Sequence, residues 1–456
     1  MTTTRSLCVA AVAAAAIMGM APAHAEDPPT RGGLDHIQHI VVIYLENRSF
    51  DNVFGLFPGA DGITRAVTAA PPQVDASGYP YATLPQPRDT TARPPGPDPR
   101  FPADLPNRPF DIGRYVPLDR LTGDLVHRYY QNIAQIDGSR DDRFAEVSDA
   151  AGLTMGYYDT SGTELWRWAR RFTLADHFFM GAFGGSFLNH MMLVCACAPV
   201  YQGAPDLLKA RLDADGRLIA DGALTPDGHA VNTIQPFYPP YAPRAADPAK
   251  RMPPIDLPTI GDRLTAKGVS WAWYAGGWAD ALAGKAPADF EYHHQPFAYF
   301  RAFAPGSPAR AEHLKDGADF LADIAAGTLP AVAFYKPAGR FDEHPGYATI
   351  TEGDRHLGHI LESIERSPMW STTAIIVTYD ENGGFYDHVP PPRIDRWGPG
   401  NRVPAVIISP FAKKGQVDHT VYDTASILKF IEARFGLAPL TDRDARADGL
   451  SGAFDF

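Results

Sequence analysis

Apolar runs rich in β-branched residues alternate with amphipathic stretches along most of this chain. Runs typical of buried strands cover residues 40–45, 269–274, 331–335, 374–379 and 405–409. Helical periodicity marks residues 123–135, 262–267, 309–326, 354–366 and 426–435. Strands that alternate with helices predict an α/β fold, with a largely parallel central sheet covered by helices on both faces.

Two of the apolar runs, the first and the fourth, end in adjacent side chains that carry oxygen atoms. These are Glu46 with Asn47, and Asp380 with Glu381. Ligands of α/β proteins bind beyond the carboxyl ends of strands, and adjacent carboxylates repel each other unless a cation or a proton lies between them. Two such strand ends predict one shared site for a divalent metal ion. A polar turn after a core strand explains either segment equally well when it is considered alone.

A pair of glycines precedes a serine at the start of a further predicted helix. The glycines let the backbone turn tightly before Ser186, and an apolar run follows at residues 191–194. A serine at a helix N-terminus faces free N–H groups and the positive end of the helix dipole, which favour an anion. Ser186 is therefore a candidate nucleophile, although a serine there can also be only a helix cap. Ser49 and Asp51, which follow the first strand, are assigned to capping.

These segments resemble the signatures of the bacterial phosphoesterase family, which joins phospholipases C with acid phosphatases inside the alkaline phosphatase superfamily. The matching segments are LENRSFD at residues 45–51, AFGGSFLNH at 182–190 and YDENGG at 379–384. Further segments resemble the acid phosphatase branch, namely DLVHR at 124–128, YHHQPF at 292–297 and EHPG at 343–346. The resemblance extends from about residue 35 to about residue 435 and implies an alkaline phosphatase-like fold.

The resemblance also implies a set of site residues. One divalent metal ion (Ca²⁺, Mg²⁺, Mn²⁺ or Zn²⁺) is expected on Glu46, Asn47, Asp380, Glu381 and the Oγ atom of Ser186. The catalytic residues are then Ser186, His127, His293, His294 and His344. Substrate contacts are expected from Asn189, His190, Asp262 and His388.

Several of these residues have a structural alternative in the sequence itself. His293 and His294 point to opposite sides if the segment is extended, so one or both can be structural. Aromatic neighbours predict a partly apolar pocket wall around them, formed by Phe290, Tyr292, Phe297, Tyr299 and Phe300. His127 falls in the predicted helix 123–135, and Asp262 can be the N-terminal cap of the next one. We assign the pair His356 and His359 to the surface.

The resulting function is a secreted, metal-dependent acid phosphatase that hydrolyses phosphomonoesters through a phosphoserine intermediate. Protonated histidines in the site predict an acid optimum. The alternative is a phosphodiesterase of the phospholipase C type; the chain ends soon after its last predicted helix, whereas the family's phospholipases C usually carry further C-terminal domains. A third alternative is a non-catalytic protein that binds phosphate or metal on the same scaffold.

The N-terminus predicts export from the cytoplasm. Arg5, an apolar run at residues 8–20 and the small residues around position 25 are typical of a signal peptide at residues 1–25, cleaved before a single domain at 26–456. The expected location is periplasmic or secreted. Cys195 and Cys197 both fall in a predicted helix, where their side chains diverge, so a mutual disulfide is not expected.

Composition narrows the set of partners. The formal net charge of −12 disfavours general binding of nucleic acid or anionic membrane, and no segment after the signal peptide predicts stable membrane insertion. The expected partner is a small phosphate ester, and the oligomeric state is not determined. Proline-rich insertions at residues 69–117 and 235–258 predict ordered but irregular excursions or mobile flaps.

Overall fold

A computed structural model describes residues 1–2, 33–64 and 70–456 of the chain. Its centre is a sheet of eight strands in the order β13-β12-β14-β1-β15-β16-β6-β17, and every strand except β16 has the same direction. The strands are β1 (His39–Leu45), β6 (Thr173–Ala175), β12 (Trp271–Ala275), β13 (Leu314–Asp316), β14 (Val332–Lys336), β15 (Thr373–Tyr379), β16 (Ala405–Ile408) and β17 (Gln416–Asp418). The predicted α/β fold with a largely parallel sheet is confirmed.

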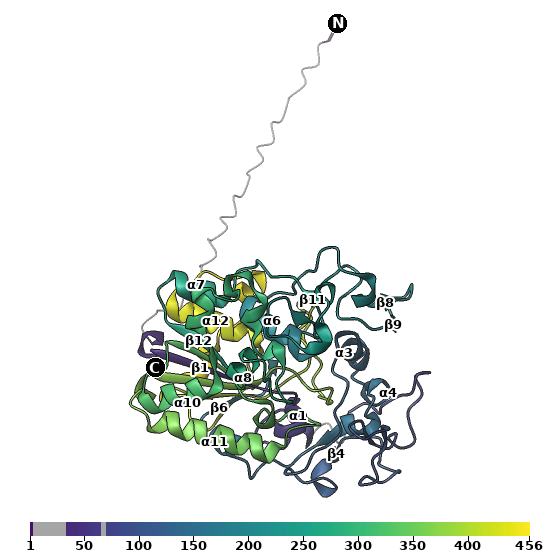
Figure 1. Ribbon diagram of the computed structural model, residues 1–456. Helices are drawn as coiled ribbons and strands as arrows, with labels where there is room; N and C mark the ends of the chain where they lie inside the picture. The colour runs from purple at the N-terminus through teal and green to yellow at the C-terminus, as the bar shows by residue number, and fades with distance from the viewer. Residues whose placement is uncertain (3–32, 65–69) are drawn as a thin grey trace.

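Helices cover both faces of this sheet. In Figure 1, α10 and α11 lie on one side of the sheet, and α6, α7 and α12 lie on the other. Their bounds are α6 (Ser186–Cys195), α7 (Ile260–Ala266), α10 (Gly317–Ala326), α11 (Ile350–Arg366) and α12 (Thr424–Phe435). The other α-helices with bounds inside the described residues are α1 (Phe50–Phe54), α3 (Tyr129–Ile136), α4 (Phe144–Val147), α5 (Glu164–Arg171), α8 (Trp278–Leu282), α9 (Pro308–His313) and α13 (Asp442–Arg446).

The innermost strands are apolar because both of their faces are covered. β1 lies between β14 and β15, and residues 40–45 of β1 are all buried. The parallel register pairs Leu45 of β1 with Tyr379 of β15. The residues that follow these two strands therefore emerge side by side at one edge of the sheet.

The predicted helices at 262–267, 354–366 and 426–435 are present with ends that differ by a few residues, whereas two others depart further from the structure. The helix expected from residue 123 begins only at Tyr129, so the preceding segment is extended. The helix expected at residues 309–326 is divided into α9 and α10 by the edge strand β13, which pairs with β12. Asp316 ends that strand and forms a capping box with Asp319, so α10 starts there as a separate helix.

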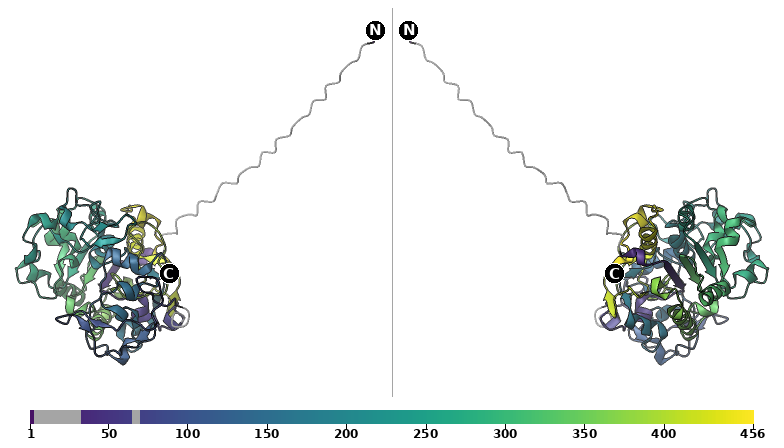
Figure 2. Two further views of the ribbon diagram at one scale, coloured as in Figure 1. Left: turned by 90° about the vertical axis from the view of Figure 1, so that its right-hand side faces the viewer. Right: turned by 90° about the vertical axis from the view of Figure 1, so that its left-hand side faces the viewer.

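The described parts of the proline-rich insertions are ordered and irregular. Short strand pairs stabilise them, β2 (Arg88–Asp89) with β3 (Gly96–Pro97), β4 (Phe110–Asp111) with β5 (Gly156–Tyr157), and β10 (Gln235–Pro236) with β11 (Arg251–Met252). The remaining short strands are β7 (Phe178–Phe179), β8 (Arg211–Leu212), β9 (Leu218–Ala220) and β18 (Tyr422–Asp423). Segments coloured blue, which include the first insertion, gather at one side of the molecule (Figures 1 and 2).

The cysteines correct one expectation, because Cys195 and Cys197 form a disulfide. Only Cys195 belongs to α6. Ala196 follows with a left-handed backbone (φ 46°) and turns the chain back. The two Cα atoms therefore lie 5.1 Å apart, within the range that a disulfide spans.

Two features of the sequence relate to export and membranes. The predicted signal peptide at residues 1–25 lies outside the described residues, apart from the first two. Among the helices of the described chain, none has the length and apolar character needed to cross a bilayer.

Glu432 of α12 generates a prediction for stability. Burial, together with a hydrogen bond to Asp444, raises the pKa of Glu432 to about 9. A carboxyl with a raised pKa binds its proton more tightly in the folded state than in the unfolded state, where the pKa is about 4.3. The free energy of unfolding therefore falls as pH rises from that value towards 9. We expect Glu432→Gln to be more stable than the wild type by about 1 kcal/mol at pH 8, with a smaller difference at pH 5.

Urea unfolding at several pH values measures this difference. Glu312→Gln is the matched control, because the Glu312 side chain is largely exposed. A difference that is constant with pH, or that grows towards acid pH, would contradict the prediction.

Candidate active site

The carboxyl ends of β1, β14 and β15 bring charged side chains together in the interior. Glu46 follows β1, Lys336 ends β14 and Asp380 follows β15, and all three are buried. The Nζ atom of Lys336 forms an ion pair with Oε1 of Glu46 and donates to the Leu45 carbonyl at 3.3 Å. Opposite charges therefore come into direct contact, because these neighbouring parallel strands end at the same edge of the sheet.

Backbone groups hold the two predicted metal-binding segments against each other. Asn47 has a left-handed backbone (φ 64°), and its N–H donates to Oδ1 of Asp380 at 3.2 Å. Gly383 donates its N–H to Oε2 of Glu381 at 2.5 Å. A Cβ atom on Gly383 would lie 2.3 Å from the Asn47 carbonyl oxygen, so the glycine permits this close approach.

Ser186 lies at the first position of α6, as the sequence predicts. Its Oγ atom donates to Oε2 of Glu46 at 3.1 Å and lies 3.4 Å from Oδ1 of Asn47. The preceding Gly185 could not carry a side chain, because a Cβ atom there would lie 2.6 Å from the His127 carbonyl oxygen. The serine, two of the predicted metal ligands and a helix N-terminus therefore meet at one point.

Asn189 holds the loop before Ser186 instead of facing the substrate. Its Nδ2 atom donates to the carbonyl oxygens of Ala182, Gly184 and Gly185, and its Oδ1 atom accepts from the N–H of Ala182. The side chain is fully buried. The expected substrate contact is therefore replaced by a structural one, because the backbone groups of the tight glycine turn need hydrogen-bond partners.

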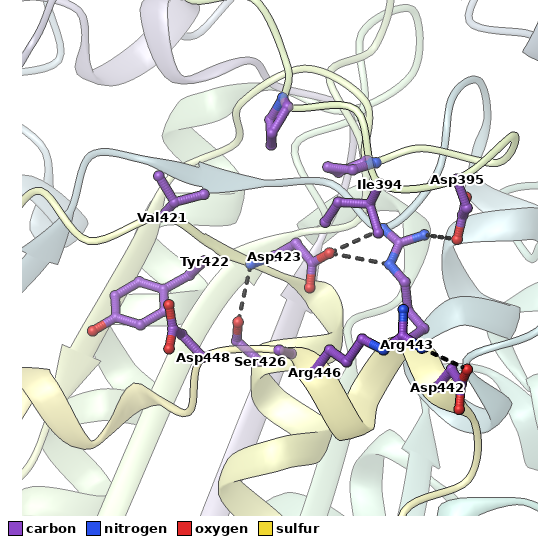
Figure 3. Close-up of a pocket in the computed structure, with 13 residues that line it drawn as sticks. Ile394, Asp395, Val421, Tyr422, Asp423, Ser426, Asp442, Arg443, Arg446 and Asp448 are labelled. Carbon is purple, nitrogen blue, oxygen red and sulfur yellow. Dashed lines mark hydrogen bonds and ion pairs between the residues drawn. The ribbon is translucent and has the colours of Figure 1, made fainter. Parts of the chain in front are cut away.

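Arg443 supports the same loop from outside the site. It donates to the carbonyl oxygen of Gly181 at 2.8 Å and pairs with Asp395 and Asp423, each at 2.9 Å. Figure 3 shows the guanidinium between these two carboxylates, with Arg443 in the wall of a cavity of about 290 Å³. The charged bridge joins α13, the start of α12 and the segment before Ser186.

The donor set of this site fits a divalent cation. Among the described residues, Oδ2 of Asp380 and Oε1 of Glu381 have no hydrogen-bond partner although both atoms are buried. Burial and repulsion from neighbouring carboxylates raise the pKa of Asp380 and of Glu381 well above their usual values. Burial also acts to raise the pKa of Glu46, but the charges of Lys336 and His294 outweigh it and lower that pKa. A cation on these oxygens would relieve the repulsion.

His293 and His294 both reach the site, although an extended segment would have separated them. The segment is a 3-10 turn, Tyr292–His294, and both rings line the same cleft. Nε2 of His294 lies 2.9 Å from Oε1 of Glu46. Burial lowers the pKa of both histidines, which is opposite to the change that the predicted acid optimum requires.

His127 and His344 line the cleft from two further segments. His127 lies in the extended segment before α3, not in a helix, and its Nε2 atom is 3.4 Å from Nδ2 of Asn47. The rings of His127 and His344 are 5.4 Å apart between centroids. Burial lowers the pKa of His344 to about 4. The His127 side chain is less buried, with 20% of its surface exposed.

His190 lies behind these residues and is fully buried. Its Nδ1 atom is 2.7 Å from the Ser186 carbonyl oxygen, and its ring stacks on His294 with centroids 5.5 Å apart. Burial lowers its pKa well below the usual value. His190 therefore supports the wall of the site, and the structure gives it no surface for the expected substrate contact.

The cleft in front of Ser186 has a volume of about 750 Å³ and mainly polar walls. The aromatic wall predicted from the sequence is wrong, because none of its five residues lines this cleft; most of them pack in the core, as Phe297 does against Trp271. The polar side chains of the wall, apart from the predicted site residues, are Thr90, Thr91, Arg93, Asp124, Arg128, Asp149, Asn232, Thr233, Arg244, Glu291 and Tyr347.

Like Asn189 and His190, the other two expected substrate-binding residues lie outside the cleft. Asp262 accepts from Thr259 in the capping box of α7, so its structural alternative is the one observed. His388 donates instead towards Asp51, with Nδ1 2.7 Å from Oδ2. Burial would lower the pKa of His388, but the hydrogen bond and charge of Asp51 raise it to about 9. The sequence assigns both Ser49 and Asp51 to helix capping. Ser49 caps α1 as expected, whereas the Asp51 carboxylate contacts His388.

Sequence reasoning missed Lys336 and most of the polar cleft wall. Lys336 follows the apolar run at residues 331–335, so the strand-end argument that identified Glu46 could have identified it as well. The wall residues come from irregular segments, including the first proline-rich insertion, and carry no periodic signal. Their position became evident only when the segments were placed around the sheet edge.

The metal-site geometry predicts the effect of removing single charges. We expect Asp380→Asn and Glu46→Gln to lose bound metal while keeping the fold, because each replacement keeps the shape of the side chain but removes its charge. Metal analysis of the purified variants, with circular dichroism as the folding check, measures this. Asp262→Asn is the control and should keep the wild-type metal content. Stoichiometric metal in both site variants would exclude the shared-site model.

Comparisons with known proteins assign the chain to a family. The non-hemolytic phospholipase C of Pseudomonas aeruginosa is 25% identical over 480 aligned positions, which cover 95% of this chain and 59% of that protein. Phospholipase C A of Mycobacterium tuberculosis is 26% identical over 472 positions, which cover 94% of this chain and 79% of that protein. This chain therefore spans about three-fifths of the first relative and about four-fifths of the second.

A solved structure from Vibrio parahaemolyticus, described as a protein in the alkaline phosphatase superfamily, is also similar. It has 10% identity and a TM-score of 0.35, with 73% of this chain and 72% of that chain covered. The sequence profile described as Phosphoesterase family matches residues 37–438. The profile and the phospholipase C relatives indicate a phosphoric ester hydrolase. Because the match covers most of its length, the chain belongs to the Phosphoesterase family.

Proposed function

We propose that this protein is a metal-dependent phosphodiesterase of the phospholipase C type. The observation that carries the proposal is the large polar cleft in front of Ser186, which has room for both substituents of a phosphodiester. The phospholipase C relatives, similar along nearly the whole chain, support the same choice. This choice replaces the acid phosphatase function that the sequence favoured.

Two grounds for the acid phosphatase are absent from the site. One was a set of protonated histidines that would bind a phosphomonoester dianion, but burial lowers the pKa values of His293, His294 and His344. The other was an aromatic wall that would narrow the cleft, and those side chains lie elsewhere. A singly charged diester needs less positive charge and more room than a dianionic monoester.

Ser186 is the proposed nucleophile. A divalent cation on Glu46, Asn47, Asp380 and Glu381 would lower the pKa of the serine hydroxyl and neutralise charge on the phosphate oxygens. The Oγ atom attacks phosphorus, a new Oγ–P bond forms, and the bond from phosphorus to the leaving alcohol breaks. Water then hydrolyses the phosphoserine, so that the second product is a phosphomonoester.

The leaving alkoxide needs a proton, and His127 is the proposed donor. It is the most exposed of the cleft histidines and lies 3.4 Å from the amide nitrogen of Asn47. His293, His294 and His344 are more deeply buried. In this mechanism they orient the phosphate oxygens through hydrogen bonds from neutral rings.

The polar walls favour a particular placement of the substrate. Threonines, arginines and carboxylates line the cleft, and Leu125 and Val126 are the apolar side chains among the lining residues. A hydrophilic head group therefore fits inside the cleft, whereas acyl chains would stay outside, at the surface of an aggregate. Secretion or periplasmic export, based on the predicted signal peptide, is part of the proposal.

A substrate panel tests the choice between diester and monoester. We expect bis-p-nitrophenyl phosphate and phosphatidylcholine to be hydrolysed with a higher kcat/KM than p-nitrophenyl phosphate, because the cleft holds two substituents. Initial rates on metal-loaded protein measure this. Faster turnover of the monoester, with an optimum below neutrality, would restore the acid phosphatase. Bound metal without any turnover would favour the non-catalytic alternative.

The role of Ser186 has its own test. We expect Ser186→Ala to reduce kcat by at least about 10³-fold without change in fold, because the described part of the site offers no second hydroxyl at the helix N-terminus. The control is Ser426→Ala, which removes a buried hydroxyl at the start of α12, away from the cleft. Turnover by Ser186→Ala within about tenfold of the wild type would remove the serine from the mechanism.

A further inference from the structure

Lys336 is a buried lysine beside the active site, and the proposed mechanism gives it no role. It ends β14, where it pairs with Ala275 of β12, and its carbonyl oxygen accepts from the N–H of Gly276 at 3.0 Å. Its side chain is completely buried. The Nζ atom forms an ion pair with Oε1 of Glu46 and donates to the Leu45 carbonyl at 3.3 Å. The ammonium group is therefore a fixed positive charge at the carboxyl edge of the sheet.

The surroundings of Lys336 separate it from the substrate. Lys336 is not among the residues that line the cleft, and its Nζ atom lies 5.4 Å from the centroid of the Tyr44 ring, in the core. It acts on the site through Glu46, whose second oxygen, Oε2, accepts from the Ser186 hydroxyl at 3.1 Å. The two oxygens of Glu46 thus have different partners, the lysine on one side and the nucleophile on the other.

Glu46 also belongs to a second group of possible metal ligands. One ligand atom from each of Glu46, His293 and His294 lies within 4.8 Å of the other two. Nδ1 of His293 is buried and has no hydrogen-bond partner among the described residues. Two imidazoles and one carboxylate are a common ligand set for zinc. By ligand type and spacing alone, this half of the site would hold a divalent ion next to the one expected on Asp380 and Glu381.

Lys336 opposes such an ion, because its ammonium group contacts the carboxylate that two ions would share. Its Nζ atom and Nε2 of His294 both approach Oε1 of Glu46, the histidine nitrogen at 2.9 Å. A divalent ion on that oxygen would lie directly beside the positive charge of the lysine. The repulsion would be strong, since both groups are buried and little solvent screens them. The oxygen that a second ion needs is therefore already bound by a cation of the protein.

We propose that Lys336 restricts the active site to a single divalent ion, because its ammonium group binds the Glu46 oxygen that a second ion would require. Lys336 is a positioning residue, since it acts through Glu46 and does not contact the substrate. His293 and His294 consequently stay free of metal, and their rings remain available for the phosphate oxygens. The inference rests on the proposed function, which places the first ion on the carboxylates after β1 and β15.

Metal content of the full-length protein tests the proposal. The purified protein is stripped with EDTA, dialysed against excess ZnCl₂, freed of unbound zinc and analysed for metal. We expect Lys336→Met, which removes the charge, to bind one ion more per chain than the wild type. The double variant Lys336→Met with His294→Gln should lose this additional ion, whereas His294→Gln alone should keep the wild-type content. Lys267→Met, which changes an exposed lysine at the end of α7, is the control and should also keep it.

A spectroscopic readout separates a pair of bound ions from a purely structural effect. With Mn²⁺ in place of Zn²⁺, two ions that share Glu46 should couple magnetically and change the EPR spectrum of an isolated ion. We expect the coupled spectrum in Lys336→Met but not in the wild type or in Lys336→Arg, whose guanidinium keeps the positive charge. A role of Lys336 in stability alone would lower the Tm of Lys336→Met without producing that spectrum.

Equal metal content in the wild type and Lys336→Met would overturn the proposal. A loss of one ion from the wild type on His294→Gln alone would overturn it as well, because the second ion would then already be present. A wild type that binds no metal would instead refute the shared metal site of the proposed function, and this inference with it, so the two failures are distinguishable. If Lys336→Met misfolds by circular dichroism, Lys336→Gln, which keeps a hydrogen-bond donor beside Glu46, decides the result.

Discussion

The burial of like charges at the carboxyl edge of the sheet is the constraint on which the active site depends. Glu46, Asp380 and Glu381 are all removed from solvent, and the buried Lys336 forms an ion pair with Glu46. Burial and mutual repulsion raise the pKa values of Asp380 and Glu381. The folded state tolerates the free-energy cost of burying these carboxylates because an apolar core holds the parallel strands β1, β14 and β15 in register. A cation would complete the site by supplying the missing positive charge.

The nucleophile depends on a different kind of support. Ser186 begins a helix directly after a tight glycine turn, and the polar groups of that turn need partners. Asn189 supplies them from within the helix, while Arg443 holds Gly181 from the opposite side. The serine is therefore placed by contacts that never touch the substrate. Such preorganisation is what a nucleophile requires, because a small displacement of the attacking atom costs a large part of its rate.

The histidines show how burial changes the meaning of a motif. In the sequence, the pair at residues 293–294 suggested positive charge for a phosphate dianion. In the structure, the surrounding protein removes water from His293, His294 and His344 and lowers their pKa values. Neutral rings in a wide polar cleft suit a diester better than a dianion. The proposed substrate class thus follows from desolvation and volume, which no local pattern reports.

The sequence by itself determined the strands β1, β12, β14, β15 and β16, the helices α7, α11 and α12, and the residues that follow the ends of β1 and β15. It did not indicate the strands β6, β13 and β17. Apolar runs specify the buried strands, and the position of Glu46, Asp380 and Ser186 relative to those runs is a local property. Only the tertiary structure decided what these residues meet. In the folded chain, Lys336 contacts Glu46, a turn at Ala196 brings two cysteines together, and His388 and Asp262 lie outside the cleft. These outcomes depend on contacts between segments far apart in the chain, and therefore on packing and desolvation that periodicity does not encode.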